Sequence, residues 1–141
     1  MQDKEILSKI EKLLTWYENN HSKAEIVNLL DFQDKLSLLC VNMARMTALS
    51  KGNAMRSYFD RKYTFSVNKM SFINAGEGIG KSDEMATASI KLKKDHEVND
   101  IEYSEMLNLM LKQSNRVLSS CQQRISFLKV EWERMHRLTT T

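Results

Sequence analysis

The sequence predicts an all-α protein built from a few long helices. The chain has 141 residues, which suits a single domain spanning 1–141, and it contains no proline and only four glycines. An average sequence of this length carries about 7 prolines and 10 glycines. Because these residues mark turns, few connections between helices are expected. The apolar fraction of 42% argues against disorder.

Two helical patterns occupy the first half of the chain. Apolar residues at spacings of three and four predict an N-terminal helix within residues 1–21. Ser22 and Glu25 have the spacing of a capping box, which predicts a long second helix over 22–69. Gly52 is its one weak interruption, since glycine inside a helix costs about 1 kcal/mol relative to alanine.

Three of the four glycines lie in residues 71–81, which predicts a glycine-rich loop. Ser82 is the expected N-cap of the next helix, with Asp83 and Glu84 favourable near its positive end. Residues 82–137 are expected to form a helix pair or one long helix, with a possible bend between Asp95 and Asp100.

The C-terminal segment carries the most regular pattern of the chain. Its apolar and small residues alternate spacings of three and four, with one repeat of four at Cys121, over more than four heptads, which is typical of a coiled-coil seam: Tyr103, Leu107, Met110, Ser114, Val117, Cys121, Ile125, Leu128, Trp132 and Met135. Since a long helix with a narrow apolar stripe must pair with another helix, we expect a helical hairpin and a homo-oligomer.

Cys40 and Cys121 each fall at an apolar helical position, where a buried free thiol is the expected state and a disulfide or ligand pair the alternative. No stretch approaches the ~20 apolar residues of a membrane span, and the N-terminus lacks the pattern of a secretory signal. These observations predict a soluble cytoplasmic protein without a membrane partner.

The positive charge is concentrated in the middle of the chain. Residues 51–94 carry nine basic and four acidic side chains, whereas residues 1–50 and 95–141 each carry six basic and seven acidic ones. Residues 56–65 combine three basic side chains with four aromatic rings. Cations that neutralise phosphates and rings that stack on bases are what single-stranded nucleic acid requires. The candidate binding residues are Lys51, Arg56, Tyr58, Arg61, Lys62, Tyr63, Lys69, Lys91, Lys93 and Lys94.

The alternative interpretation of this segment is structural. Tyr58 and Phe65 are seven residues apart, as in a buried stripe, so the rings could pack on a neighbouring helix while Arg61 and Lys62 are solvated. Both interpretations stay open, and a mixture of core rings and phosphate-contacting cations is expected.

Two motifs resemble sites of chemistry but lack the required context. Residues 75–82 match a loose phosphate-loop pattern ending in Lys81 and Ser82, yet no apolar strand precedes it. The loop could instead contact a DNA phosphate. Glu18 with His21 and Glu133 with His136 have the spacing of di-iron ligands, but they lie at hydrophilic helix ends. We expect no enzymatic activity, no cofactor and no metal site.

The order of elements resembles a known family. Arg56-Ser57-Tyr58-Phe59, a glycine-rich loop, Lys81-Ser82-Asp83-Glu84-Met85-Ala86-Thr87, a lysine-rich turn and a long helix containing Cys121 follow one another over about residues 40–137. This layout is similar to that of the recombination mediator proteins of T-even-like phages, the UvsY type. In that family, DNA-contacting Lys and Arg residues precede the aromatic pair; the matching positions here are Asn53, Met55 and Arg56, of which only Arg56 is basic.

The resemblance implies a helical ring that binds single-stranded DNA, helps displace the single-strand-binding protein and loads the strand-exchange recombinase, in the host cytoplasm if the chain is phage-encoded. Lys51, Arg61 and Lys62 could replace the missing basic residues. The alternative is a non-enzymatic structural or adaptor protein, such as a virion component or a protein-binding module. A nucleotide hydrolase using Lys81 and Ser82 is the third interpretation.

Overall fold

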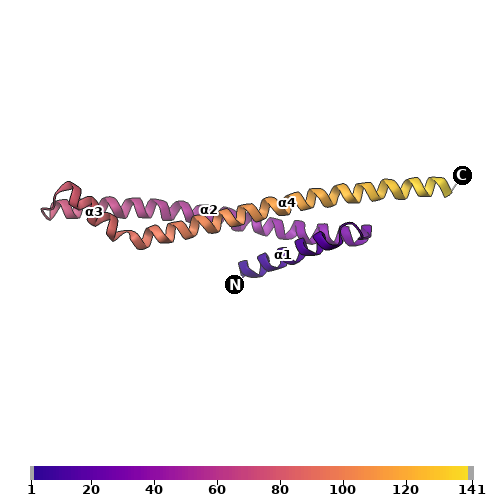
Figure 1. The fold of residues 1–141 in the computed structure, drawn as a ribbon, viewed down its shortest axis with the longest axis horizontal. Coiled ribbons are helices and arrows are strands. Elements are labelled where there is room, and N and C mark those ends of the chain that lie inside the picture. Colours follow the sequence, from indigo (N-terminus) through magenta and orange to yellow (C-terminus); the bar gives the residue numbers. More distant parts are fainter. Residues whose placement is uncertain (1, 140–141) are drawn as a thin grey trace. The chain divides into compact units, whose positions relative to one another are not determined.

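The computed structural model describes residues 2–139, and within them the chain forms four α-helices and no strand (Figure 1). The helices are α1 (Gln2–Asn20), α2 (Ile26–Asn74), α3 (Ile79–Ser89) and α4 (Lys91–Thr139). The predicted all-α class is confirmed. Two compact units divide the chain: unit 1 comprises residues 1–46 and 108–141, and unit 2 comprises residues 47–107. Both α2 and α4 therefore contribute to each unit.

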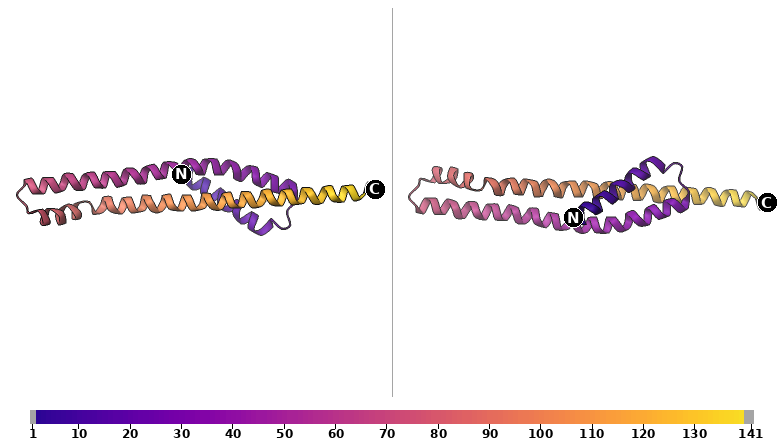
Figure 2. Two further views of the ribbon diagram at one scale, coloured as in Figure 1. Left: turned by 90° about the horizontal axis from the view of Figure 1, so that it is seen from above. Right: turned by 90° about the horizontal axis from the view of Figure 1, so that it is seen from below.

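Unit 1 contains the hydrophobic core. Helix α1 packs against the first part of α2 and the second part of α4 (Figure 2). Ile10, Leu29 and Leu36 are fully buried, and the Trp16 and Phe32 rings stack with their centroids 5.5 Å apart. The Tyr17 hydroxyl and the Ser120 hydroxyl are 2.8 Å apart, which gives the polar end of a buried ring a hydrogen-bonding partner. This arrangement buries one stripe of each helix, as the apolar spacing requires.

Both cysteines are buried in unit 1 as free thiols, as expected. The Cys121 thiol donates to the Leu29 carbonyl over 3.5 Å. Burial raises the pKa of both thiols above the ordinary value of 9.0, because a thiolate would lose its hydration there. At Cys40 a hydrogen bond with Ser114 partly offsets this rise in pKa.

Unit 2 is a hairpin whose two long arms are joined by polar contacts. The arms are residues 47–74 of α2 and 91–107 of α4, and α3 lies at the turn end (Figure 2). The Ser57 hydroxyl donates to Asp100 over 2.5 Å, and the Arg61 guanidinium forms an ion pair with Glu97. Asn68 on α2 donates to the Ser89 hydroxyl over 2.8 Å. As the residue numbers on α2 increase from Ser57 to Arg61 to Asn68, those of their partners decrease from Asp100 to Glu97 to Ser89. The two arms are therefore antiparallel.

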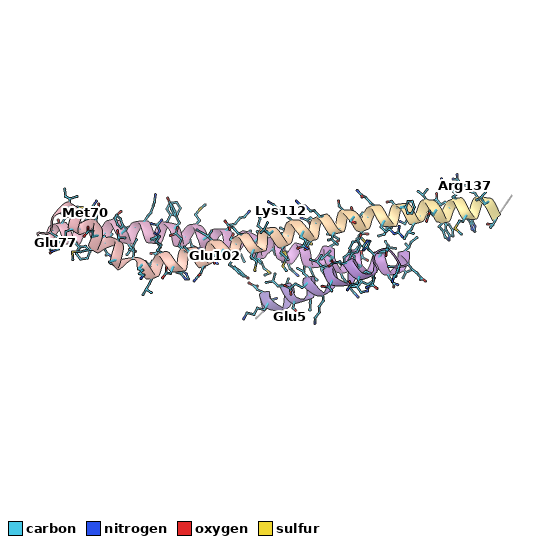
Figure 3. The ribbon with its side chains drawn as sticks, in the orientation of Figure 1. Glu5, Met70, Glu77, Glu102, Lys112 and Arg137 are labelled. Atoms are coloured by element: carbon cyan, nitrogen blue, oxygen red, sulfur yellow. The ribbon has the colours of Figure 1, made fainter. Side chains whose placement is uncertain are left out.

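The turn of unit 2 is shorter than the sequence predicts. Residues 71–74 continue α2, and α3 already begins at Ile79, so only residues 75–78 connect them. Gly76 has a φ of +94°, a conformation that glycine adopts without strain. Figure 3 labels Met70 near the end of α2 and Glu77 in this turn.

Both predicted helix caps are wrong. Helix α2 begins at Ile26, four residues after Ser22. Gly78, and not Ser82, is the N-cap of α3; Ser82 lies inside the helix, fully buried, with no hydrogen-bond partner for its hydroxyl among the described residues. The helix is interrupted at Ile90, which separates α3 from α4. Residues 95–100 continue α4 without a bend or interruption in its helical assignment. Burial of Ser82 by tertiary packing outweighed its local preference for a cap.

The predicted seam of α4 is buried over its middle and exposed at both ends. Leu107, Ser114, Cys121 and Ile125 are buried, and Met110, Val117 and Leu128 are half-buried. Tyr103, Trp132 and Met135 are exposed, the last two at 60% and 67%. In unit 1, α4 continues past the point where α2 begins, so the helix of residues 129–139 has its apolar side chains in solvent (Figure 2).

Candidate nucleic-acid interface

The second part of α2 has two distinct faces. One face, defined by Ser50, Ser57 and Arg61, points toward α4 within unit 2. The remaining exposed surface of the helix, which we call the outward face of α2, is formed by Met55, Arg56, Phe59, Lys62, Tyr63, Val67 and Met70, and at its edge Met55 also borders Ile101 and Glu105 of α4. All seven are exposed. A basic and aromatic surface therefore lies on one side of a single helix.

Three of the predicted phosphate-binding cations are already paired with carboxylates inside unit 2. Arg61 pairs with Glu97, whose side chain is only 9% exposed. The Lys69 ammonium is 2.8 Å from Asp83, and the Lys93 ammonium is 2.7 Å from Asp60. A cation already neutralised by a carboxylate contributes little to phosphate attraction. This geometry makes Arg61 a structural residue and weakens the case for Lys69 and Lys93.

The other predicted cations have no carboxylate partner among residues 2–139: Lys51, Arg56, Lys62, Lys91 and Lys94. Arg56 donates to the Asn53 side-chain oxygen over 2.5 Å, a contact within one turn of the same helix. The Lys62 ammonium lies 4.8 Å from the centre of the Tyr58 ring. Arg56 and Lys62 flank Phe59 on the outward face, whereas Lys91 and Lys94 lie at the start of α4.

The four rings of residues 56–65 divide into two pairs. Phe59 and Tyr63 are exposed at 60% and 71% and lie one turn apart on the outward face of α2. Tyr58 and Phe65 are half-buried. The Tyr58 ring is covered by the cations of Lys62 and Arg61, the latter 5.4 Å from its centre, and by the edge of Phe59. Phe59 and Tyr63 can therefore accept a stacked base, while Tyr58 orients the cations beside it.

Phe59 was not among the residues predicted to contact nucleic acid. Its exposure follows from geometry that periodicity alone does not show, because Ser57 and Arg61 hold the centre of the face of α2 that meets α4. In most hairpins the apolar stripe faces the partner helix, so an aromatic residue would be assigned to the core. The signal available in the sequence was that Arg56, Phe59 and Tyr63 follow one another at spacings of three and four.

The remaining candidate motifs gain no support from their surroundings. Lys81 pairs with Glu77 over 3.3 Å, so its charge is already partly neutralised at the start of α3. The Tyr17 carbonyl oxygen accepts a hydrogen bond from the His21 Nδ1 over 2.9 Å, and the His21 ring stacks on the Tyr17 ring. Across residues 2–139, no group of three His, Cys, Asp or Glu side chains has the geometry to hold a metal ion. The described helices include none that could cross a membrane.

Searches against models of protein families, curated protein sequences and solved structures found no match to this chain.

Proposed function

We propose that this chain is a single-stranded DNA-binding recombination mediator that helps load a strand-exchange recombinase onto DNA. The observation that supports it is the outward face of α2, where Arg56 and Lys62 lie beside the exposed rings of Phe59 and Tyr63. The cations would neutralise phosphates and the rings would stack on unpaired bases. Such a surface discriminates against duplex DNA, whose bases are already stacked, and tolerates any base sequence.

A single copy offers too few contacts for tight binding. Two unpaired cations on the outward face, with Lys51 nearby, neutralise about three phosphates, and each stacked base contributes about 1–3 kcal/mol. Several linked copies would bind far more tightly, because the second and later contacts become intramolecular. A homo-oligomer, such as a ring, is therefore part of the proposal, and its exposed apolar side chains are the available interfaces.

The protein partners in this proposal come from the resemblance to phage mediators. They are the recombinase and the single-strand-binding protein, in a host cytoplasm if the chain is phage-encoded. Lys91, Lys94 and Lys51 are additional phosphate contacts in this proposal, because none of them has a carboxylate partner within residues 2–139.

A second candidate function is a non-enzymatic structural or adaptor protein. The observation in its favour is that Met55, Val67 and Met70 share the outward face with the rings and are exposed at 62%, 47% and 57%. An apolar stripe of this length is also what a partner helix would cover. Under this alternative the same face binds protein, and the cations are solvated.

The two functions are separated by the binding of a fluorescent oligothymidine at two salt concentrations. The proposal predicts binding whose affinity falls steeply between low and moderate salt, and an Arg56→Glu/Lys62→Glu variant that binds at least about tenfold more weakly at low salt. Phe59→Ala/Tyr63→Ala should weaken binding by a similar factor with little change in the salt dependence, because stacking releases no counterions.

The matched control is Lys4→Glu/Lys23→Glu, which changes the net charge equally on exposed lysines of unit 1. Its affinity for the oligonucleotide should stay close to that of the wild type. Absence of binding at low salt, or equal losses in the two charge-reversal variants, would exclude the outward face of α2 as a nucleic-acid site and leave the adaptor function.

A further inference from the structure

Unit 1 has an apolar groove between α1 and α2 whose rim is basic. Four apolar side chains, Leu13, Trp16, Leu38 and Leu39, line it together with three lysines, Lys9, Lys12 and Lys35. The groove has a volume of about 450 Å³, and no carboxylate is among its lining residues. Leu38 is 69% exposed, while Trp16 is held in place by its stacking on Phe32.

The three lysines are available to a docking partner. Within residues 2–139, Lys12 has no ion-pair partner. Lys9 pairs with Glu5 over 3.0 Å and Lys35 with Asp31 over 2.8 Å, both within one turn of a helix and both more than half exposed. Unlike the Lys69–Asp83 and Lys93–Asp60 pairs, which join two helices, these pairs lie within a single helix, so they contribute little to stability and can be exchanged without separating packed helices. A rigid apolar floor with a cationic rim matches an amphipathic helix that carries carboxylates beside its apolar side chains.

A helix with that chemistry is present in the same chain. Residues 95–107 of α4 contain five acidic side chains and no Lys or Arg. Two of the five, Glu97 and Asp100, face α2 within the unit 2 hairpin. The opposite side of this segment, the outward face of α4, carries Leu92, Asp95, Asn99, Glu102 and Met106 at alternating spacings of three and four, with Glu105 at its edge. All six are exposed (Glu102 is labelled in Figure 3).

The composition of unit 2 explains why this face requires a partner. The long arms of its hairpin are joined by three polar pairs and fully bury one large apolar side chain, Leu107, whereas Leu92, Val98 and Met106 of α4 are exposed at 83%, 44% and 44%. A hairpin whose long arms fully bury a single large apolar side chain gains little hydrophobic stabilisation on its own. Docking of its outward face on another surface would supply that burial.

We infer that the lysine-rimmed groove of one copy receives the outward face of α4 of a second copy. The acidic segment is favoured over the other exposed part of α4, because residues 129–139 carry three basic side chains against two acidic ones. The contact joins two different surfaces, so it is heterologous and each copy can pass the same contact on to the next, which generates a ring or a filament. The outward face of α2 stays free.

This inference rests on the proposed function for its purpose, the repetition of a DNA-binding face, and is tested by assembly in the absence of DNA. Sedimentation velocity of the full chain at low salt should show assembled wild type and a self-association constant reduced at least about tenfold in Lys12→Glu/Lys35→Glu. The Glu102→Lys/Glu105→Lys variant should lose assembly to a similar extent. Circular dichroism at the helical bands confirms that each variant is folded.

Charge reversal on the groove and on the outward face of α4 together is the decisive experiment. The variant that combines all four substitutions restores opposite charges across the contact, so it should assemble again, and an equimolar mixture of the two double variants should do the same. Lys4→Glu/Lys23→Glu and Glu131→Lys/Glu133→Lys are the matched controls, since they make the same charge changes on exposed residues outside both surfaces. Both controls should assemble like the wild type.

Several results would overturn the inference. They are a monomeric wild type at tens of micromolar, assembly unaffected by either double variant, or no restoration in the fourfold variant. Loss of assembly in the groove variant alone would assign the groove to a different occupant. Failure of the proposed function looks different: the wild type and Arg56→Glu/Lys62→Glu would both assemble, and neither would bind the oligonucleotide.

Discussion

The Arg61 guanidinium and the Glu97 carboxylate form the most buried ion pair found within residues 2–139, with side-chain exposures of 23% and 9%. Because Glu97 has little access to water, removal of its cation leaves a charge that is neither hydrated nor paired. We expect Arg61→Met to lower the free energy of unfolding by about 3 kcal/mol. Urea denaturation followed by circular dichroism measures this loss.

The neighbouring residue provides the control for that prediction. Lys62 is exposed and belongs to the outward face of α2, so Lys62→Met should change the free energy of unfolding by less than about 0.5 kcal/mol. The double variant Arg61→Met/Glu97→Leu removes both charges and should recover most of the stability lost in Arg61→Met. Equal stability of Arg61→Met and Lys62→Met would show that the pair is not structural.

The buried thiols give the protein a stability that depends on pH in the alkaline range. Burial raises the pKa of Cys40 and Cys121 above 9.0, so the folded chain keeps protons that the unfolded chain releases. The corresponding stabilisation is fully present below pH 9 and is lost as the pH rises through the folded-state pKa values.

The measurement is thermal unfolding between pH 7 and about pH 10.5, compared with a Cys40→Ala/Cys121→Ala variant. All other titratable groups are the same in the two proteins, so the difference between the two curves isolates the thiols. The wild type should lose its advantage over the variant above pH 9, the ordinary thiol value. A difference that stays constant with pH would contradict the prediction.

Among the individual residues, sequence reasoning located the basic and aromatic segment but not the partners of its cations. Arg61 and Lys62 are adjacent in sequence, yet one faces α4 and the other faces solvent. Their difference arises from the register of α2 against α4, which brings Glu97 to Arg61 from 36 residues away. No local pattern specifies that register when the cross-helix contacts are made by isolated polar pairs and not by a continuous apolar stripe.

Among the helices, unit 1 shows the expected relation between periodicity and burial. Leu36 is fully buried, with a relative exposure of 0%, and it belongs to the core cluster with Phe32 and Met43. We expect Leu36→Ala to lower the free energy of unfolding by about 3–4 kcal/mol, since the packed helices cannot close the space that remains. Chemical denaturation provides the value.

The comparison for Leu36→Ala is Leu49→Ala on the same helix. Leu49 is 66% exposed, so truncation should change the free energy of unfolding by less than about 1 kcal/mol when the protein is measured at a dilution that favours single chains. Similar losses in the two variants would mean that Leu49 is covered, either by a neighbouring copy or by a different packing of α2.

The helices themselves could be predicted well, because the lack of proline and the apolar spacing act locally. The bounds of α1 differ from expectation by a residue, and the apolar residues assigned to the middle of the α4 seam are buried or half-buried. Caps were predicted poorly. Ser82 has a strong local preference for an N-cap, but α3 starts at Ile79 and buries Ser82 instead. Tertiary packing determines where these helices begin, and it cannot be predicted from the local preference of a single residue.

At the scale of the whole molecule, the two units differ in what holds them together. The hydrophobic core cluster belongs to unit 1, whereas the long arms of unit 2 are joined by Ser57–Asp100, Arg61–Glu97 and Asp60–Lys93 contacts. Polar contacts between exposed helices contribute less than burial of a core of this size. The stability of unit 2 should therefore be lower than that of unit 1 wherever the outward faces are uncovered.

Amide hydrogen exchange measured by mass spectrometry tests this difference. In the monomeric Glu102→Lys/Glu105→Lys variant, amides of residues 50–68 and 93–105 should exchange at least about tenfold faster than those of residues 30–43 and 112–125, since local opening there requires about 1.4 kcal/mol less free energy. In the assembled wild type, residues 93–105 should gain protection, because docking in the groove stabilises the hairpin by mass action. Uniform protection across both units in the monomer would show that the polar hairpin is as stable as the core, and that it needs no partner to hold its fold.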